Sequence, residues 1–274
     1  TLRSTLNKLA AGQTVGKLTP LSFSGAEKAA ILTRTLESGS YAADGSCDGI
    51  SGKPAENELV WLLSTKEALA LDGTLRIMDS SFTSDQASTR WWLRSPGKNE
   101  YVNAAVKYDG TVFIDGQSLM NTQTVRPAFH LSADKIALVT AADSSDTLGL
   151  TAASKTGPWK LTLKDDAHSG FALGEVLTEE DSVSVAYTGA QTGEGEYISA
   201  AVLSGGTVTY YGPVQSLADG AAEGTATIDL SGVTMAEGDR LYVFNEHLGD
   251  STHSNYSSAL YEINLTSKDA PTFT

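Results

Sequence analysis

Cysteine is almost absent from this sequence, which has Cys47 and no other in 274 residues. A single thiol forms no intramolecular disulfide and builds no thiolate metal cluster. Cys47 also lies near Asp44 and Asp48, and neighbouring acids disfavour the thiolate that a nucleophile needs. We therefore interpret Cys47 as a structural loop residue.

Long apolar runs are missing as well. No stretch reaches the roughly 18 residues that a membrane span needs, so we expect no membrane insertion of this segment. No export signal is visible either, but the chain opens abruptly at Thr1. Such an opening is typical of a segment trimmed inside a domain, so the missing signal carries little information.

Basic residues are scarce in the second half of the chain. The net charge is −14; residues 135–274 hold 6 Lys and Arg against 19 Asp and Glu, whereas residues 1–134 are close to neutral. Nucleic-acid binding needs clustered basic residues, so we expect no nucleic-acid partner. The acidity is typical of a solubilising surface. Clustered acids also bind calcium in extracellular modules, but the spacing of a calcium loop is not present here.

Catalytic motifs are absent too. The sequence contains no Gly-x-Ser-x-Gly, His-Glu-x-x-His, phosphate loop or dinucleotide fingerprint. His247 and His253, near Glu246 and Asp250, match no standard zinc spacing, and we interpret them as part of a polar loop between two strands. We therefore expect no enzyme activity, no metal site and no cofactor. A glycosidase pair among the many carboxylates stays open as an alternative.

The patterns that are present predict an α+β first domain. Capping boxes at residues 24–27 and 64–67 mark two helix starts, and a further helix is expected near residues 4–11. An apolar run of buried-strand length covers residues 58–63. Further strands follow at 91–95, 101–108, 111–114 and 124–131, with a hairpin turn at Asp109-Gly110.

The second half predicts an all-β domain. Residues 140–157 are rich in Ala, Ser, Asp, Thr and Gly, and we expect a linker there. Seven short strand-like runs beyond it are typical of an immunoglobulin-like β-sandwich; they cover residues 159–164, 182–187, 197–203, 207–211, 225–230, 240–244 and 259–265. The predicted domains are therefore residues 1–139 and 158–274.

Four ordered motifs in the first domain carry a resemblance to a known family. They are the pairs Leu-Arg and Leu-Asn at residues 2–3 and 6–7, Ser-Gly-Ala-Glu-Lys at 24–28, Leu-Leu-Ser-Thr-Lys-Glu-Ala at 62–68, and Trp-Trp-Leu-Arg-Ser-Pro-Gly at 91–97 with Val-Arg-Pro-Ala-Phe at 125–129. Over residues 1–135 the chain resembles a domain-of-unknown-function family of exported proteins from Gram-positive, often gut-dwelling, bacteria. The resemblance implies an extracellular or cell-surface location.

The Trp-rich strand, the hairpin and the late Val-Arg-Pro strand are also similar, more distantly, to C-type-lectin-like folds, which include formylglycine-generating enzymes. This similarity implies a C-type-lectin-like fold for residues 1–139. The paired cysteines of formylglycine generation and the calcium-binding triplets of sugar-binding lectins are absent. The second domain resembles the acidic modules that often follow such domains, through residues 160–165 and 243–246.

Two adjacent tryptophans are the first candidates for ligand contact. Trp91 and Trp92 face opposite sides of a predicted strand, so one belongs to the core and the other is free to stack on a sugar ring or a partner side chain.

Further candidates come from a predicted polar loop at residues 115–123. Asp115, Gln117 and Asn121 can hydrogen-bond sugar hydroxyls there. The alternative interpretation is that the segment is an ordinary turn. Arg94 and Arg126 lie within apolar strands, where an Arg is usually paired with carboxylates or carbonyl oxygens, and we expect structural roles for both.

These observations predict a non-enzymatic binding module on the cell surface or outside the cell, with a glycan or a host or bacterial surface protein as partner. One alternative is a hydrolase of wall or host glycans, which needs a deep cleft with two carboxylates about 5–10 Å apart. The other is a structural stalk or assembly component, which needs no pocket at all.

Overall fold

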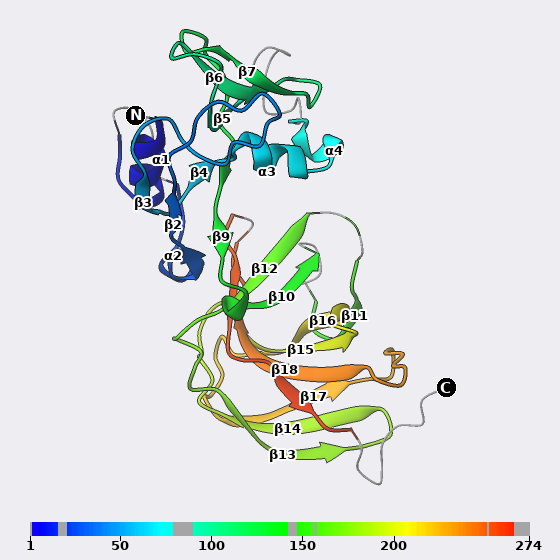
Figure 1. The fold of residues 1–274 in the computed structure, drawn as a ribbon. Helices are drawn as coiled ribbons and strands as arrows, with labels where there is room; N and C mark the ends of the chain where they lie inside the picture. The colour runs from blue at the N-terminus through cyan, green and yellow to red at the C-terminus, as the bar shows by residue number, and fades with distance from the viewer. Residues whose placement is uncertain are drawn as a thin grey trace. The chain divides into compact units, whose positions relative to one another are not determined.

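The computed structural model describes residues 2–15, 21–78, 90–141, 147–154, 156, 158–250 and 252–265 (Figure 1). The fold is rich in β-structure. By its internal contacts the chain divides into two compact units. Unit 1 comprises Thr1–Phe23 and Ile31–His130, and unit 2 comprises Ser24–Ala30 and Leu131–Thr274.

Unit 1 combines short helices with small sheets of two or three strands. Among the described residues these sheets pair β1 with β9, β2 with β3, β4 with β8, and β5 with β6 and β7. Its elements are α1 (Leu2–Ala10), β1 (Ile31–Leu32), β2 (Arg34–Leu36), β3 (Ala55–Glu58), β4 (Trp61–Leu62), α3 (Thr65–Ala70), α4 (Gly73–Arg76), β5 (Trp91–Pro96), β6 (Val102–Val106), β7 (Val112–Ser118), β8 (Pro127–Ala128) and β9 (His130–Leu131), which ends at the boundary.

The capping box at residues 64–67 forms as expected and begins helix α3. The Ser64 hydroxyl accepts a hydrogen bond from the Glu67 N–H (3.0 Å), and the Glu67 carboxylate accepts one from the Ser64 N–H (3.0 Å). These bonds satisfy two backbone donors that a helix start otherwise leaves unpaired. Ala68 of this helix then packs against Trp91, Leu93 and Val106 in the core of the three-stranded sheet.

The Asp-Gly turn also forms between β6 and β7. Gly110 has φ +81°, which a glycine adopts without steric cost. A Cβ at this position would lie 2.9 Å from the Gly73 carbonyl oxygen, so the turn also lets helix α4 approach closely.

The apolar run at 58–63 is not one strand, which corrects our expectation. Strand β3 ends at Glu58 and β4 begins at Trp61. Between them the side chain of Asn7 on helix α1 replaces the ladder: its oxygen accepts from the N–H groups of Leu59 (2.7 Å) and Val60 (3.3 Å). The expected strand at 124–131 is likewise divided, into β8 and β9. Pro127 pairs with Leu62 and has no N–H to extend the ladder.

Unit 2 contains two sheets, mostly antiparallel, that enclose its main core. A three-stranded sheet has the order β13-β14-β17, and an eight-stranded, curled sheet has the order β10-β12-β19-β18-β15-β16-β11, with β20 beside β18. The elements are α2 (Gly25–Ala30), the 3-10 turn η3 (Ala133–Lys135), β10 (Ile136–Ala141), β11 (Thr151–Ala152), β12 (Trp159–Lys164), β13 (Ala172–Thr178), β14 (Ser182–Thr188), β15 (Glu196–Ser204), β16 (Thr207–Ser216), β17 (Gly224–Asp229), β18 (Arg240–His247), β19 (Asn255–Ser257) and β20 (Tyr261–Ile263).

Alternating residues of the large sheet explain its two apolar faces. Ile198, Ala200 and Val202 of β15 enter the core shared with the three-stranded sheet. Ala201, on the opposite face, joins Phe244 and other residues in a second cluster inside the curl of the sheet. Side chains along a strand alternate between faces, so one strand serves both clusters.

All seven expected strand regions of this half contain strands; β12 has the expected ends, and the other six have shifted ends. The sequence reading missed β10, β11, β13 and β19. Thr151 and Ala152, within the expected linker, pair with Tyr211 and Tyr210 of β16. Strand β10 pairs with β12 inside unit 2, although its first residues were assigned to the first domain. His247 ends strand β18 and does not lie in a loop. The domain limits 1–139 and 158–274 themselves stay a prediction.

Candidate functional site

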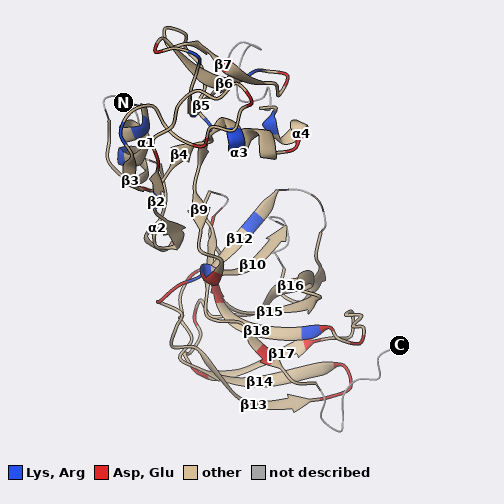
Figure 2. Cartoon of the chain, viewed as in Figure 1, with Lys and Arg blue, Asp and Glu red and all other residues tan. Residues whose placement is uncertain are grey.

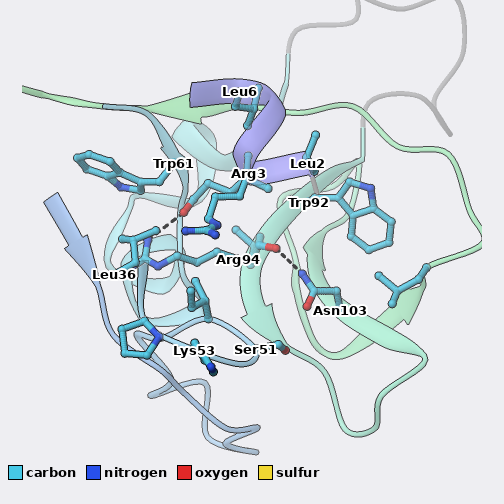
Figure 3. A pocket seen from close by; sticks show the side chains of 15 residues that line it. Leu2, Arg3, Leu6, Leu36, Ser51, Lys53, Trp61, Trp92, Arg94 and Asn103 are labelled. Atoms are coloured by element: carbon cyan, nitrogen blue, oxygen red, sulfur yellow. Dashed lines mark hydrogen bonds between the residues drawn. The ribbon is translucent and has the colours of Figure 1, made fainter. Parts of the chain in front are cut away.

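A pocket of about 560 Å³ opens in unit 1 (Figure 3). This volume falls within the range of about 300–1,000 Å³ that is typical of small-molecule sites. Apolar side chains dominate its wall, with a few polar groups among them. The lining residues are Leu2, Arg3, Leu6, Leu36, Ile50, Ser51, Lys53, Pro54, Trp61, Leu62, Trp92, Leu93, Arg94, Asn103 and Leu119.

Trp92 forms one aromatic wall of the pocket (Figure 3). Its neighbour Trp91 is fully buried, and the Trp91 indole N–H donates to the carbonyl of Arg76 (3.0 Å). Trp92 projects from the other face of β5 and is partly exposed. The strand alternation therefore assigns the two indoles to different environments, and we keep only Trp92 as a ligand-contacting candidate.

Asn103 on β6 lies beside Trp92 in the lining. Its side-chain N–H donates to the Leu93 carbonyl (2.6 Å), which fixes the orientation of the amide. Its side-chain oxygen accepts no hydrogen bond from the residues that the structure describes. The amide therefore presents an acceptor to the pocket.

Arg3 reaches the pocket from helix α1. Its Nη1 lies 2.7 Å from Glu58 Oε1, and the Arg3 side chain is 40% exposed. Asn7 also donates to the Glu58 carboxylate. Burial raises the pKa of Glu58, and the charge and hydrogen bond of Arg3 oppose that rise. The pair anchors one end of the Arg3 guanidinium.

Arg94 belongs to the pocket lining, and its side chain is 4% exposed. Its Nη2 lies 2.5 Å from Asp48 Oδ1, its Nη1 pairs with Glu67, and Nη1 also donates to the Leu62 carbonyl (2.9 Å). Arg34 pairs with the other oxygen of Glu67 (2.5 Å). Carboxylates and carbonyl oxygens thus hold the Arg94 guanidinium, and the structural role expected for it stays a prediction.

Glu67 is the acidic centre of this cluster. Burial works to raise its pKa, but hydrogen bonds from Arg94, the Ser64 N–H and Arg34 outweigh burial and lower the pKa to about 2. The carboxylate is therefore ionised at neutral pH, and the two guanidinium groups around it are neutralised by Glu67 and Asp48 together.

The polar residues predicted from the sequence lie outside the pocket lining. Asp115 and Gln117 are on strand β7, not in a loop, which corrects that expectation. Asp115 accepts a hydrogen bond from the Tyr41 hydroxyl (2.7 Å). Gln117 pairs with Asn103 across the sheet. Asn121 is exposed in the turn after β7. None of the three lines the pocket with Trp92, and their ligand role stays a prediction.

Arg126 contacts a backbone carbonyl and an aromatic ring, and its expected structural role stays a prediction. Its Nη1 donates to the Leu75 carbonyl (2.5 Å), and its guanidinium lies over the ring of Trp91, 5.4 Å from the centroid. These contacts hold the segment before β8 against the buried indole.

Sequence reasoning missed Arg3, Lys53 and Asn103 as members of the site. Asn103 had a usable signal, because a polar Asn interrupts the otherwise apolar run of this predicted strand. Such an interruption indicates a side chain with a polar partner or a ligand. Arg3 belongs to the Leu-Arg pair at residues 2–3 that contributed to the resemblance, but that pair gave no indication of a ligand contact. Lys53 lies in no motif, and about 50 residues separate it from Arg3.

Unit 2 contains a second polar cluster, centred on His168 and Glu196. Glu196 lies 3.1 Å from His168 Nε2 and 3.2 Å from His247 Nδ1, and Asp165 contacts the other ring nitrogen of His168. Burial lowers the pKa of His168, but hydrogen bonds to Glu196 and Asp165 outweigh burial and raise it overall. Among the described residues, this cluster included, no group of three or more His, Cys, Asp or Glu side chains is arranged so that it could hold a metal ion.

Glu246 lies in the same unit and is fully buried. The Thr162 hydroxyl (3.0 Å) and the Asn255 amide (3.2 Å) donate to one of its oxygens, and the Tyr211 hydroxyl (2.7 Å) donates to the other. Burial raises the pKa of Glu246, and these donors oppose the rise. Because the carboxyl is buried and its oxygens accept these hydrogen bonds, we interpret it as part of a structural network.

The comparisons with known proteins bear on unit 1. Residues 16–133 match the model of a family described as Domain of unknown function (DUF6273). That match covers less than half of the chain and most of unit 1, including the sequence motifs that carried the resemblance at residues 24–28, 62–68 and 91–97. No curated protein and no solved structure matches the chain. None of the described helices is long and apolar enough to cross a bilayer.

Proposed function

We propose that this chain is a binding module that works outside the cell or on its surface, and that its ligand is a glycan held in the pocket at Trp92. The observation that carries the proposal is the partly exposed Trp92 indole, which lines a 560 Å³ pocket beside the amide of Asn103. A sugar ring has an apolar face that stacks on an indole and hydroxyls that bond to an amide.

The rest of the proposed assignment follows from the sequence patterns. Unit 1 would be a C-type-lectin-like domain, and unit 2 an immunoglobulin-like sandwich that acts as a spacer. The β-rich fold, the two units and the match of residues 16–133 to a family model support this arrangement. The acidic character of unit 2 (Figure 2) is favourable for a soluble spacer.

The hydrolase alternative finds no support in the pocket. A glycosidase needs two carboxylates that flank the scissile bond, and the lining contains neither Asp nor Glu. The nearby acids Glu58, Asp48 and Glu67 are engaged by Arg3, Arg34 and Arg94. A stalk needs no such pocket, so the binding role accounts for more of the geometry.

The test is a glycan-array screen of the full chain beside three variants. Trp92→Leu keeps apolar packing against Leu62 and its neighbours but removes the aromatic face. Trp92→Phe keeps a smaller aromatic face, and Trp159→Leu removes the other exposed indole, which lies in unit 2 and is 57% exposed. Far-UV circular dichroism checks that each variant is folded.

We expect saturable binding that Trp92→Leu weakens about tenfold or more, a loss of about 1.4 kcal/mol. Trp92→Phe should bind with intermediate affinity, and Trp159→Leu should bind like the parent. Binding should persist in chelator, because no metal-ligand group occurs among the described residues. Absence of binding to every glycan, or equal binding by the folded Trp92→Leu variant, would refute the proposal and favour a protein partner or a stalk.

A further inference from the structure

We propose that the glycan bound by this pocket is acidic and carries a carboxylate on the sugar that stacks on Trp92. This inference rests on the proposed function and specifies its ligand class. It is drawn from the charges of the pocket lining, which includes Arg3, Lys53 and Arg94 and has no acidic residue.

Lys53 is the first of two cations available to a ligand. It is exposed on the rim of the pocket and forms no ion pair with any residue in the described parts of the chain. An exposed ammonium group without a protein partner is bound by water. A ligand carboxylate can replace some of that water without first breaking an ion pair within the protein. Figure 3 shows Lys53 and Ser51 at the same side of the pocket.

Arg3 is the second available cation. A guanidinium group carries five N–H donors, and the bond to Glu58 uses Nη1. With 40% of its side chain exposed, Arg3 has further donors for a carboxylate in a fork geometry. The partly buried bond to Glu58 orders the side chain before the ligand arrives, which reduces the entropy lost on binding.

Arg94 differs from both because its guanidinium is already engaged. Asp48, Glu67 and the carbonyls of Leu62 and Asp48 take its donors. We therefore assign no direct ligand contact to Arg94 and place the ligand carboxylate between Arg3 and Lys53.

The environment of Trp92 and Asn103 favours a sugar as the group that carries the carboxylate. The apolar lining around Trp92 needs a flat, partly apolar group, and the free oxygen of Asn103 needs a donor such as a ring hydroxyl. A uronic acid supplies the ring face, the hydroxyls and the carboxylate in one residue. An acidic peptide lacks the hydroxyl-bearing ring and is the less complete match.

The experiment measures affinity by calorimetry for oligosaccharide pairs in which one member has an acidic group that its partner lacks, as a free carboxylate, as an added acidic sugar or as a sulfate. The pairs are tri-galacturonic acid with its methyl ester, sialyllactose with lactose, and a sulfated chondroitin fragment with its unsulfated form. The proteins are the full chain, Lys53→Gln, and Lys66→Gln as a control that removes an exposed charge from helix α3 outside the pocket lining.

We expect at least one carboxylate-bearing sugar to bind tenfold or more tightly than its uncharged partner, with an affinity that falls as salt is added. Lys53→Gln should reduce that preference about fivefold, and Lys66→Gln should leave it unchanged. Tight binding of a methyl ester or of lactose, equal to that of the acid, would overturn the inference and leave the glycan-binding function in place. A preference for sulfate over carboxylate would overturn the carboxylate assignment. Absence of binding by every sugar would overturn both the inference and the glycan-binding function.

Discussion

Glu67 joins three features of unit 1, and its replacement is the sharpest test of how this unit is held together. The carboxylate completes the cap of helix α3, pairs with buried Arg94 of the pocket lining, and pairs with Arg34 of strand β2. Glu67→Gln keeps an oxygen for the Ser64 N–H and removes the charge. The variant therefore isolates the ionic contribution from the helix cap.

The magnitude follows from the pKa of this carboxyl, which lies at about 2 instead of 4.5. A tenfold change in proton affinity corresponds to about 1.4 kcal/mol, so the difference between the two pKa values gives about 3 kcal/mol of stability at neutral pH. Solvent screening at a side chain that is 25% exposed reduces this to about 2–3 kcal/mol. Because the folded pKa is lowered, the contribution is present above pH 4.5 and is lost as the pH falls toward 2.

The assay is urea denaturation followed by tryptophan fluorescence between pH 2 and pH 7. Three of the four tryptophans, namely Trp61, Trp91 and Trp92, lie in unit 1, so a Trp159→Phe background makes the signal report that unit alone. Glu56→Gln, at an exposed position of strand β3 without an ion pair to any described residue, is the matched control. We expect Glu67→Gln to lower the free energy of unfolding by about 2–3 kcal/mol at pH 7.

The pH dependence gives the result that would refute this reasoning. The difference between the parent and Glu67→Gln should shrink below pH 4.5 and nearly vanish at pH 2. A difference below about 0.5 kcal/mol at pH 7, which is the size of an ordinary surface effect, would show that the ion cluster does not stabilise unit 1. A loss that is the same at every pH would assign it to packing and not to charge.

Two further predictions concern unit 2. Tyr211→Phe removes a hydrogen-bond donor from buried Glu246 and should lower the stability of unit 2 by about 2 kcal/mol. Hydrogen exchange of the β15 and β18 amides measures this loss. Unchanged protection of these amides would contradict a stabilising role of the Glu246 network. The raised pKa of His168, caused by hydrogen bonds to Glu196 and Asp165 that outweigh burial, predicts stability that is fully present below pH 6.5 and lost as the pH rises through the folded pKa. The same exchange measurement should find this loss in the parent and not in His168→Gln, and equal pH profiles would contradict it.

Local features of the fold were predictable because their causes are local. The boxes at residues 24–27 and 64–67 use side chains three residues apart, and both form. The Asp-Gly turn needs a single glycine at positive φ. Alternation assigned one of the two adjacent tryptophans to the core.

Features that depend on distant partners were not predictable in the same way. The break between β3 and β4 exists because Asn7, about 50 residues away, takes the N–H groups of Leu59 and Val60. Strand β19 is a run of polar residues that pairs with β12 in parallel, and no hydrophobic period marks it. Strand β13 is exposed along most of its length and contains Gly174, so it lacks the alternating pattern of a half-buried strand.

In the candidate site, too, the feature with a local cause was predictable and the feature that depends on distant residues was not. Trp92 was accessible to sequence reasoning because strand alternation concerns neighbours. The pocket around it was not, since it joins side chains from α1, the segment before β3, and strands β5 and β6. The polar residues after the β6–β7 hairpin were predicted to form a ligand-binding loop. In the structure Asp115 and Gln117 belong to strand β7 and lie outside the pocket lining.

The most direct test of the proposed site is the indole N–H region of a nitrogen-15 correlation spectrum, recorded while the best sugar from the array is added. Trp91 has a buried indole that donates to a carbonyl, Trp159 lies in the other unit, and Trp92 lines the pocket. We predict that the indole resonance of Trp92 and the side-chain amide of Asn103 shift together in a saturable manner, while the resonance of Trp159 stays in place. Shifts confined to Trp159, or binding that leaves Trp92 and Asn103 unmoved, would contradict the account.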